Sequence, residues 1–245
     1  MAQSDIDGDY AFLEGSVRGL AGWLEDFAAL MTMRLLRWQE ANVAPGPLFE
    51  IGVYQAKYFS LLLRSARARN EDVFGLDTFQ YAPEAQVRDG LAAAGFPFGY
   101  TLLKMFSTDV SASDLLQKFG AKPRFISVDG SHEKDDVHWD MRLSEQLLAN
   151  DGIVSVDDFL NPLTLGVNDG VNTFFHQPRN LVPVFYTSNK LFLSRPGPAG
   201  RYRALIEDML LADQREQASL NFQKMLGLDR SHVEQKLWGR QVLVA

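Results

Sequence analysis

The alternation of short apolar runs with longer helical stretches between residues 48 and 159 constrains the fold more than any other feature of this sequence. Strands joined by crossover helices run parallel, and such a sheet needs helices on both of its faces. We therefore predict a doubly wound, mostly parallel α/β sheet. The expected strands are 48–53, 72–79, 100–106, 124–129 and 152–159, and the expected helices are 58–69, 83–94, 111–119 and 134–150.

The segments on either side of this alternation have a different rhythm. Residues 10–41 carry apolar side chains at helical spacing and end at Ala44-Pro45-Gly46-Pro47, which stops a helix. A helix is expected at 167–176, and the extended runs 181–188 and 190–195 are separated so narrowly that they predict an antiparallel hairpin at the sheet edge. With these two runs the sheet has seven strands. A long polar helix is expected over 201–226.

This pattern divides the chain into three parts. Residues 1–44 are expected to form an N-terminal helical cap, residues 45–200 the α/β domain, and residues 201–245 a C-terminal helical extension. A cap packed on the main domain is the simplest interpretation of residues 1–44. The alternatives are a lid over a substrate or a contact between identical subunits, so a homo-oligomer formed through these helices is a further expectation.

The composition excludes several classes of protein. The chain has no cysteine, which rules out disulfides, zinc–thiolate sites, iron–sulfur clusters and cysteine nucleophiles. With 24 basic and 31 acidic residues it lacks the basic surplus that a general nucleic-acid binder needs. The acidic start MAQSDIDGDY is unlike a secretory signal, and charges interrupt every apolar run before the length of a membrane span. We expect a cytoplasmic protein that binds neither nucleic acid nor membranes.

The residues that follow the expected strands point to the position of a ligand site. In doubly wound sheets, ligands bind outside the carboxyl ends of the strands, near the point where the strand order reverses. The side chains expected there are acidic or small and include no lysine or arginine, which argues against a phosphate site. They are Glu50, Gly52, Asp77, Ser107, Asp129, Asp157 and Asp158.

Asp77 indicates that the ligand contains a ribose. It ends the second expected strand, 27 residues after Glu50, where a carboxylate can accept hydrogen bonds from both ribose hydroxyls. Nicotinamide-binding and S-adenosylmethionine-binding domains share this spacing. The segment from Gly52 to Lys57 lacks the G-x-G-x-x-G turn of the nicotinamide class. A cap of a turn or helix is the structural alternative for Asp77.

Three more carboxylates are expected to meet beyond two neighbouring strands. Asp129 follows one strand, and Asp157 and Asp158 follow the next, so the three would repel one another unless a cation lay among them. Oxygen ligands of this kind suit Mg²⁺, Ca²⁺ or Mn²⁺. Consecutive strand residues point to opposite faces, so Asp157 and Asp158 can share a metal only if the chain turns directly after the strand.

The order of the motifs E-I-G-V-Y, G-L-D-x-F, V-D-G-S-H and V-D-D-F resembles that of the metal-dependent O-methyltransferases of the class I S-adenosylmethionine-dependent superfamily. The resemblance spans residues 47–195 and is nearest to the branch of macrolide-sugar O-methyltransferases and cephalosporin-hydroxylase-like proteins. It implies a Rossmann-like fold with S-adenosylmethionine as cofactor. One departure is Ala56, where the first motif has a second glycine.

The resemblance also assigns roles to individual residues. The aspartates Asp129, Asp157 and Asp158 would hold a divalent metal, which we expect to be Mg²⁺, and His132 would act as the general base. The metal would lower the pKa of a bound hydroxyl, and His132 would take its proton during methyl transfer. The residues implied in cofactor binding are Glu50, Gly52, Tyr54, Asp77, Ser107 and Asp129.

The function expected from these features is methyl transfer to a hydroxyl group of a small-molecule acceptor. An alcohol on a sugar or natural product is favoured over a catechol. Two alternatives stay open at this point. Ala56 motivates a binding module that keeps the fold without catalysing transfer, and the three aspartates motivate a metal-dependent hydrolase or hydroxylase that needs no S-adenosylmethionine.

Overall fold

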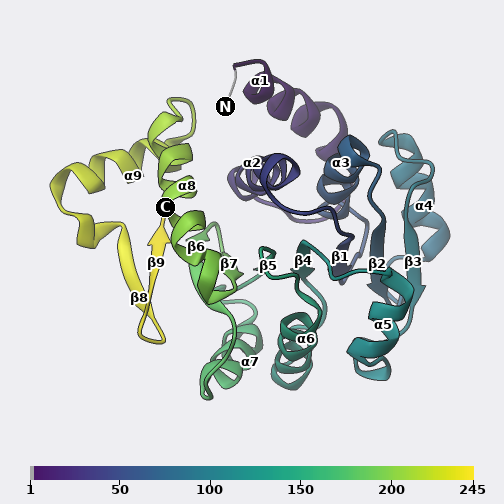
Figure 1. Ribbon diagram of the computed structural model, residues 1–245. Helices are drawn as coiled ribbons and strands as arrows, with labels where there is room; N and C mark the ends of the chain where they lie inside the picture. The colour runs from purple at the N-terminus through teal and green to yellow at the C-terminus, as the bar shows by residue number, and fades with distance from the viewer. Residues whose placement is uncertain (1–2) are drawn as a thin grey trace.

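The computed structural model of the chain describes residues 3–245, and within this part nine strands form a single sheet (Figure 1). The strand order is β3-β2-β1-β4-β5-β7-β6-β9-β8, and the first five strands of that order are parallel. The predicted doubly wound α/β fold is therefore confirmed. The strands are β1 (Leu48–Ile51), β2 (Val73–Asp77), β3 (Thr101–Lys104), β4 (Phe125–Val128), β5 (Ile153–Val156), β6 (Val182–Thr187), β7 (Lys190–Ser194), β8 (Glu234–Leu237) and β9 (Arg240–Val244).

Helices cover both faces of the sheet, as Figure 1 shows, and the central strands β1, β4 and β5 are therefore buried on both sides. One face packs against α2 (Asp26–Asn42), α3 (Phe59–Arg69), α4 (Glu84–Ala93) and α8 (Pro196–Ala212). The other face packs against α5 (Ala112–Phe119), α6 (Lys134–Leu147) and α7 (Leu165–Phe175). The predicted start of α5 is confirmed, since Ser111 and Asp114 form a reciprocal capping box.

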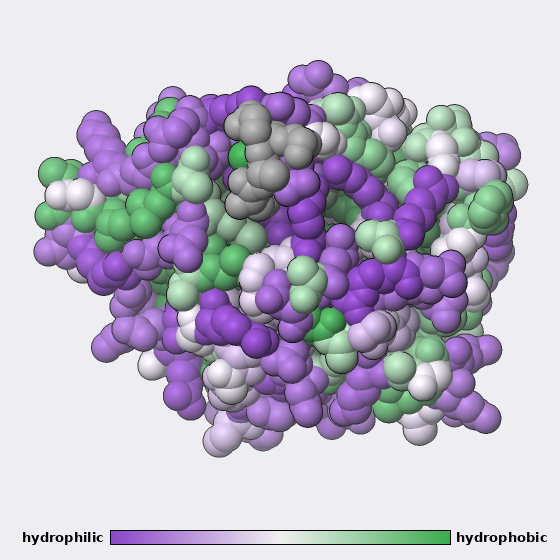
Figure 2. All heavy atoms as spheres, turned by 45° about the horizontal axis from the view of Figure 1, so that its top comes forward, coloured by the Kyte–Doolittle hydropathy of each residue, from purple (hydrophilic) through white to green (hydrophobic). Residues whose placement is uncertain are grey.

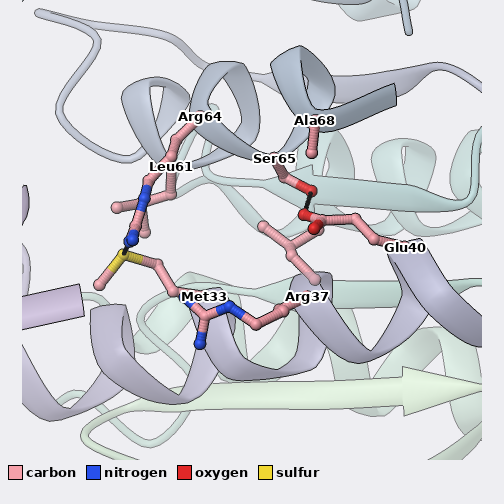
Figure 3. A pocket seen from close by; sticks show the side chains of 8 residues that line it. Met33, Arg37, Glu40, Leu61, Arg64, Ser65 and Ala68 are labelled. Carbon is pink, nitrogen blue, oxygen red and sulfur yellow. Dashed lines mark hydrogen bonds between the residues drawn. The ribbon is translucent and has the colours of Figure 1, made fainter. Parts of the chain in front are cut away.

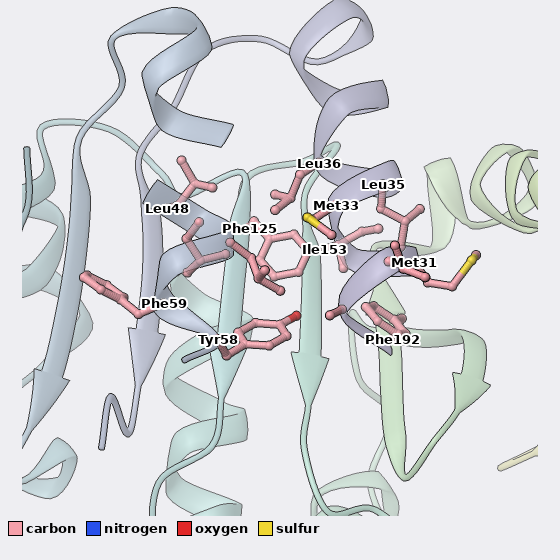
Figure 4. Packing of buried hydrophobic residues seen from close by; sticks show 14 of the residues in the cluster. Met31, Met33, Leu35, Leu36, Leu48, Tyr58, Phe59, Phe125, Ile153 and Phe192 are labelled. Atoms are coloured by element: carbon pink, nitrogen blue, oxygen red, sulfur yellow. The ribbon is translucent and has the colours of Figure 1, made fainter. Parts of the chain in front are cut away.

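The N-terminal segment contributes to the main hydrophobic core. It consists of α1 (Gln3–Phe12), a π-helical turn (Leu13–Val17) and α2. In Figure 4 the α2 side chains Met33 and Leu36 lie over Phe125 of β4 and Ile153 of β5, all of them almost fully buried. This helix thus forms part of the layer that covers the sheet, and the boundaries predicted for the three parts of the chain stay a prediction.

The C-terminal part differs from the sequence-based expectation in two ways. The predicted hairpin exists as β6 and β7, but β7 pairs with β5 inside the sheet, and β6 is followed by β9 and β8. The sheet therefore has two strands more than the seven expected. The long polar helix expected over 201–226 is two helices, α8 and α9 (Gln217–Leu228), because Asp213 binds the backbone N–H groups of Arg215 and Glu216 between them.

No helix within residues 3–245 is long and apolar enough to cross a membrane. Hydrophilic side chains cover most of the face shown in Figure 2, and the hydrophobic ones lie in separate small groups.

Candidate active site

A large cavity opens at the carboxyl ends of β1, β2, β4 and β5. Its volume is about 1100 Å³. The strand order reverses between β1 and β4, so the cavity lies where ligands bind in sheets of this kind. All of the residues predicted from the sequence to form the site line this cavity, namely Glu50, Gly52, Tyr54, Asp77, Ser107, Asp129, His132, Asp157 and Asp158.

Backbone hydrogen bonds just beyond the strands bring these residues side by side. Gly52 N–H donates to Leu76, Asp129 N–H to Ile51 and Asp157 N–H to the Val128 carbonyl, at 2.8, 2.8 and 3.0 Å. The parallel pairing thus continues for one residue past the regular strands. As a result the backbones of Asp129 and Asp157 lie side by side, directly after β4 and β5.

Glu50 is a buried carboxylate that faces the cavity from β1. Its exposed fraction is 1%, and within residues 3–245 neither of its carboxylate oxygens has a hydrogen bond of good geometry, although the Ser127 hydroxyl lies close enough to favour the charged form. Burial raises the pKa of Glu50 well above its usual range, against the opposing effect of Lys190. A buried carboxylate without a donor is ready to accept hydrogen bonds from a cationic ligand group.

The turn after β1 explains why the first motif has one glycine. Gly52 has a φ of 85°, and a Cβ there would lie 1.9 Å from the carbonyl oxygen of Asp129. The close approach of the β4 backbone therefore requires this glycine. Tyr54 and Ala56 also have positive φ angles, 45° and 66°, so the turn forms with alanine at the second glycine position.

Asp77 is held by the same turn. Its Oδ2 accepts the backbone N–H groups of Val53 and Tyr54 at 2.9 and 2.8 Å, and its Oδ1 accepts that of Phe79 at 2.6 Å. The carboxylate thus joins the ends of β1 and β2, as the structural alternative for Asp77 requires. A carboxylate has about four acceptor positions, so three bonds leave room for one more, and the predicted ribose contact stays a prediction.

The acidic pair after β5 diverges instead of converging. Asp158 has a φ of 57°, so the chain does turn directly after Asp157, as a shared metal would require, but the two side chains contact different partners. Asp157 Oδ1 lies 2.9 Å from the Lys190 Nζ. Asp158 Oδ2 lies 3.2 Å from His132 Nε2, and its Oδ1 accepts hydrogen bonds from Asn161 and Asn189 at 2.6 and 2.8 Å.

His132 lies at the mouth of the cavity with half of its side chain exposed. The hydrogen bond to Asp158 raises the pKa of His132 although partial burial opposes the shift. In the neutral imidazole Nε2–H donates to Asp158, which leaves the lone pair of Nδ1 for an incoming proton. His138, in contrast, lies in α6 away from the cavity lining.

The third strand end contributes Ser107 and places it near a buried acid. Ser107 starts a short 3₁₀ helix (Ser107–Asp109), and its carbonyl accepts a hydrogen bond from the Trp139 indole at 2.8 Å. Asp140 of α6 also lines the cavity, and burial raises its pKa to about 7. Sequence reasoning gave no role to Asp140.

A second cavity lies between α2 and α3 (Figure 3) and has a volume of about 150 Å³. Its polar side chains bond one another, with Ser65 donating to Glu40 at 2.6 Å and Arg64 in contact with Met33. It is remote from the strand ends, so the large cavity is the candidate site.

Comparisons with known proteins concern the same part of the chain. A sequence model of a family described as "Methyltransferase domain" matches residues 49–159, the stretch from β1 to just past β5. Residues 49–159 form a methyltransferase domain. No curated protein sequence is significantly similar to the chain.

Solved structures share the fold of this methyltransferase domain. The O-methyltransferase NovP has a TM-score of 0.57 at 15% identity, over 78% of this chain and 96% of its own. CalS11, a TDP-rhamnose 3′-O-methyltransferase, has a TM-score of 0.53 at 16% identity, over 70% and 80%. An O-methyltransferase from Bacillus cereus in complex with SAH has a TM-score of 0.51 at 13% identity, over 79% and 90%.

The residues predicted to hold a metal do not form an open set of ligands in the methyltransferase domain. Within residues 3–245, no group of three or more acidic or histidine side chains is arranged to hold a metal ion. The oxygens of Asp157 and Asp158 face nitrogen donors, among them an ammonium group. The predicted Mg²⁺ site is thus not supported by the donor geometry, whereas the unpaired carboxylate of Glu50 fits the predicted cofactor.

Sequence reasoning missed Lys190, which lies among the acidic residues of the cavity. It is the first residue of β7, between the Ser188-Asn189 turn and an apolar run, and its exposed fraction is 1%. A lysine that opens a buried strand needs a carboxylate partner. A lysine directly before an apolar run was therefore the sequence signal for a buried ion pair, but the sequence could not identify Asp157 as the partner.

Proposed function

We propose that the chain transfers the methyl group of S-adenosylmethionine to a hydroxyl group of a small molecule. The observation that carries the proposal is the meeting, in one cavity, of the unpaired Glu50 carboxylate and the His132–Asp158 pair. The Glu50 carboxylate suits the amino group of the cofactor, and the His132–Asp158 pair suits the removal of a proton from the acceptor. The fold shared with O-methyltransferases supports the same reaction class.

Glu50, Gly52, Tyr54, Asp77, Ser107 and Asp129 are the residues proposed to hold the cofactor. Glu50 would accept hydrogen bonds from its amino group, which compensates the cost of burying the carboxylate. Asp77 keeps one acceptor position for a ribose hydroxyl while it fixes the turn after β1. When bound, S-adenosylmethionine supplies a methyl group that is electrophilic because it is attached to a positively charged sulfur.

His132 is the proposed general base. Its Nδ1 would take the proton of the acceptor hydroxyl as the oxygen forms its bond to the methyl carbon and the carbon–sulfur bond breaks. Asp158 holds the ring by its Nε2–H and stabilises the imidazolium that forms. A divalent metal has no part in this proposal, because Lys190 and His132 already pair with two of its predicted ligands.

The mouth of the cavity favours an acceptor with an apolar body. Trp23 stacks on Tyr54 with ring centroids 6.0 Å apart, and both side chains line the cavity. Trp23, Tyr81 and Leu163 are 86, 87 and 90% exposed there. Exposed apolar side chains grouped at a cavity mouth mark a binding surface, so we propose a hydroxylated natural product in preference to a small polar sugar.

The cytoplasmic location and the homo-oligomer formed through the N-terminal helices stay predictions. The dependence of the apparent mass on protein concentration would test the oligomer. A contact through α1 would be contradicted if substitutions on its exposed face left a dimer unchanged.

Calorimetric titration of the chain with S-adenosylmethionine tests the proposal at its first step. We expect micromolar binding, and we expect Glu50→Gln to weaken it at least tenfold, or about 1.4 kcal/mol, because the carboxylate charge is lost. Glu14→Gln, which changes an exposed carboxylate outside the cavity, is the matched control. The absence of binding at about 1 mM cofactor would overturn the proposal.

Methyl transfer itself is tested by release of S-adenosylhomocysteine in the presence of a panel of hydroxylated aromatic and aliphatic compounds. We expect turnover with at least one acceptor and none after His132→Ala. Cofactor binding without transfer to any acceptor would favour the binding-module alternative instead. Activity without S-adenosylmethionine would favour the hydrolase alternative.

A further inference from the structure

Lys190 is a buried cation on the acidic floor of the cavity. Its Nζ lies 2.9 Å from Asp157 Oδ1 and 4.2 Å from the centre of the Tyr58 ring. Asp129 and Glu50 also line the cavity, and the charge of Lys190 acts on both carboxylates. An ammonium group in such a place is stabilised by the carboxylates and by the negative face of the aromatic ring.

The hairpin turn between β6 and β7 delivers this group to the strand ends. Ser188 and Asn189 both have positive φ angles, 46° and 53°, as a tight two-residue turn requires. The turn brings the Asn189 amide 2.8 Å from Asp158 Oδ1 and places Lys190 beside Asp157. Two consecutive residues, Asn189 and Lys190, therefore contact Asp158 and Asp157 respectively.

The surroundings of Lys190 are built to hold it in one position. The Tyr58 hydroxyl lies 3.0 Å from Thr32 Oγ1 of α2 and 3.0 Å from Ser155 Oγ of β5, which fixes the ring against which the ammonium packs. Tyr58 is itself buried. A lysine side chain fixed in this way loses its rotamer freedom, and only strong partners compensate that loss.

We propose that Lys190 is a resident counter-ion that takes the place of a divalent metal at the strand-end carboxylates of this methyltransferase domain. The single positive charge of the ammonium neutralises Asp157, one of the carboxylates that would have to bind a metal. A metal would therefore have to displace a covalently tethered cation. The catalytic consequence, transfer that needs no metal, rests on the proposed function, whereas the metal-binding consequence does not.

Titration of the full chain with Mn²⁺, followed by electron paramagnetic resonance after removal of metals with a chelator, tests the proposal directly. We expect the wild-type chain to show no site at these carboxylates with a Kd below about 1 mM, the weak limit of ordinary oxygen-ligand sites. One bound Mn²⁺ that is lost in Asp157→Asn would overturn the proposal. Binding that persists in Asp157→Asn lies elsewhere and agrees with it.

The variant Lys190→Gln tests the role of the ammonium, and Lys190→Arg keeps the charge. We expect Lys190→Gln to lower the Tm by roughly 10 °C, since it leaves the mostly buried Asp157 carboxylate unpaired, and 1 mM Mn²⁺ to restore part of that loss. Lys236→Gln, at an exposed position of β8, is the control for loss of a lysine. A Tm of Lys190→Gln equal to that of the wild type would contradict the proposal.

The Mn²⁺ titration of the wild-type chain tests the proposed counter-ion role even if Lys190→Gln does not fold. Activity gives a separate readout, because turnover that is unchanged by a chelator is expected once an acceptor has been found. A chain that fails to bind S-adenosylmethionine but also binds no Mn²⁺ would refute the proposed function and leave the counter-ion role of Lys190 intact.

Discussion

The contact between His132 and Asp158 determines the pH at which the imidazole can accept a proton. The hydrogen bond to Asp158 raises the pKa of His132 from its ordinary value of 6.5, so the neutral ring prevails only at a correspondingly higher pH. We expect the His132 pKa to fall in Asp158→Asn, because the carboxylate that stabilises the imidazolium is gone. Nuclear magnetic resonance titration of the imidazole protons measures this without an acceptor.

The chain has four histidines, so His132→Gln identifies the resonance by its disappearance. The resonances of the other three histidines should remain in His132→Gln. Under the proposed function, transfer rises with pH through the His132 pKa, and His132→Ala lowers the rate by roughly 10²–10⁴-fold. A His132 resonance with the same pKa in Asp158→Asn would show that the contact does not control the base.

Single residues of the site were readable from the sequence, but their pairing was not. Asp157 and Asp158 were singled out by their place after an apolar run, and His132 by the resemblance to O-methyltransferases. Asp158 has a left-handed φ of 57°, and the two neighbouring carboxylates contact different partners. Aspartate adopts this conformation more readily than most residues, but the sequence does not indicate that it does so at this position. Lys190 lies about 30 residues further along the chain, and the Ser188-Asn189 turn places it beside Asp157. This contact depends on the tertiary structure, so the local spacing of residues does not reveal it.

The packing of α7 on α6 positions the segment that carries His132. A Cβ added to Gly170 of α7 would lie 2.7 Å from both the Lys134 carbonyl oxygen and the Val137 Cβ. We therefore expect Gly170→Ala to lower the free energy of unfolding by roughly 1–3 kcal/mol, since α6 must shift to admit the methyl group. Urea denaturation followed by circular dichroism measures the change.

Gly200 of α8 provides the matched control, because a Cβ there meets no atom within 4 Å. Gly200→Ala should raise the free energy of unfolding by roughly 0.5–1 kcal/mol, as expected for alanine in a helix. Equal effects of the two substitutions would indicate that helix propensity, not interhelical contact, governs Gly170.

Element boundaries were predictable where local chemistry determines them. Ser111 begins α5 as its capping role predicts. The hairpin of β8 and β9 was missed because β8 is short and polar. The sequence signal for it is the pair Trp238-Gly239, since glycine favours a tight turn. In the structure both residues have positive φ angles, 49° and 74°. The break after α8 depends on Asp213, whose capture of backbone N–H groups the helical pattern did not reveal.

The whole-molecule topology could be predicted as far as the alternation of strands and helices extends. That alternation gives β1 to β5 and hence the cavity at their carboxyl ends. The position of β7 between β5 and β6, and of the last hairpin at the far edge, depends on which sheet edge is left open after folding. This is a property of the assembled sheet rather than of any segment.

One buried ion pair joins the two ends of the chain. Arg34 of α2 donates to Asp213 at 2.7 Å, with 1 and 5% of the two side chains exposed. Burial would raise the pKa of Asp213, but the backbone N–H of Arg215 and the Arg34 guanidinium outweigh it and lower the pKa below 3.8. The pair therefore stabilises the fold fully above pH 3.8, and its contribution is lost as the pH falls through the lower folded-state pKa.

We expect Asp213→Asn to lower the free energy of unfolding at pH 7 by roughly 3–5 kcal/mol, because Arg34 is left buried and uncompensated. The difference from the wild type should shrink as the pH falls below 3.8, where the unfolded carboxyl takes up its proton first. Asp151→Asn removes an exposed pair with Arg201 and should cost at most about 1 kcal/mol. Denaturant titrations from pH 3 to 7 compare the three proteins, and a constant difference across that range would show that the Asp213 charge does not couple the N-terminal helices to the C-terminal ones.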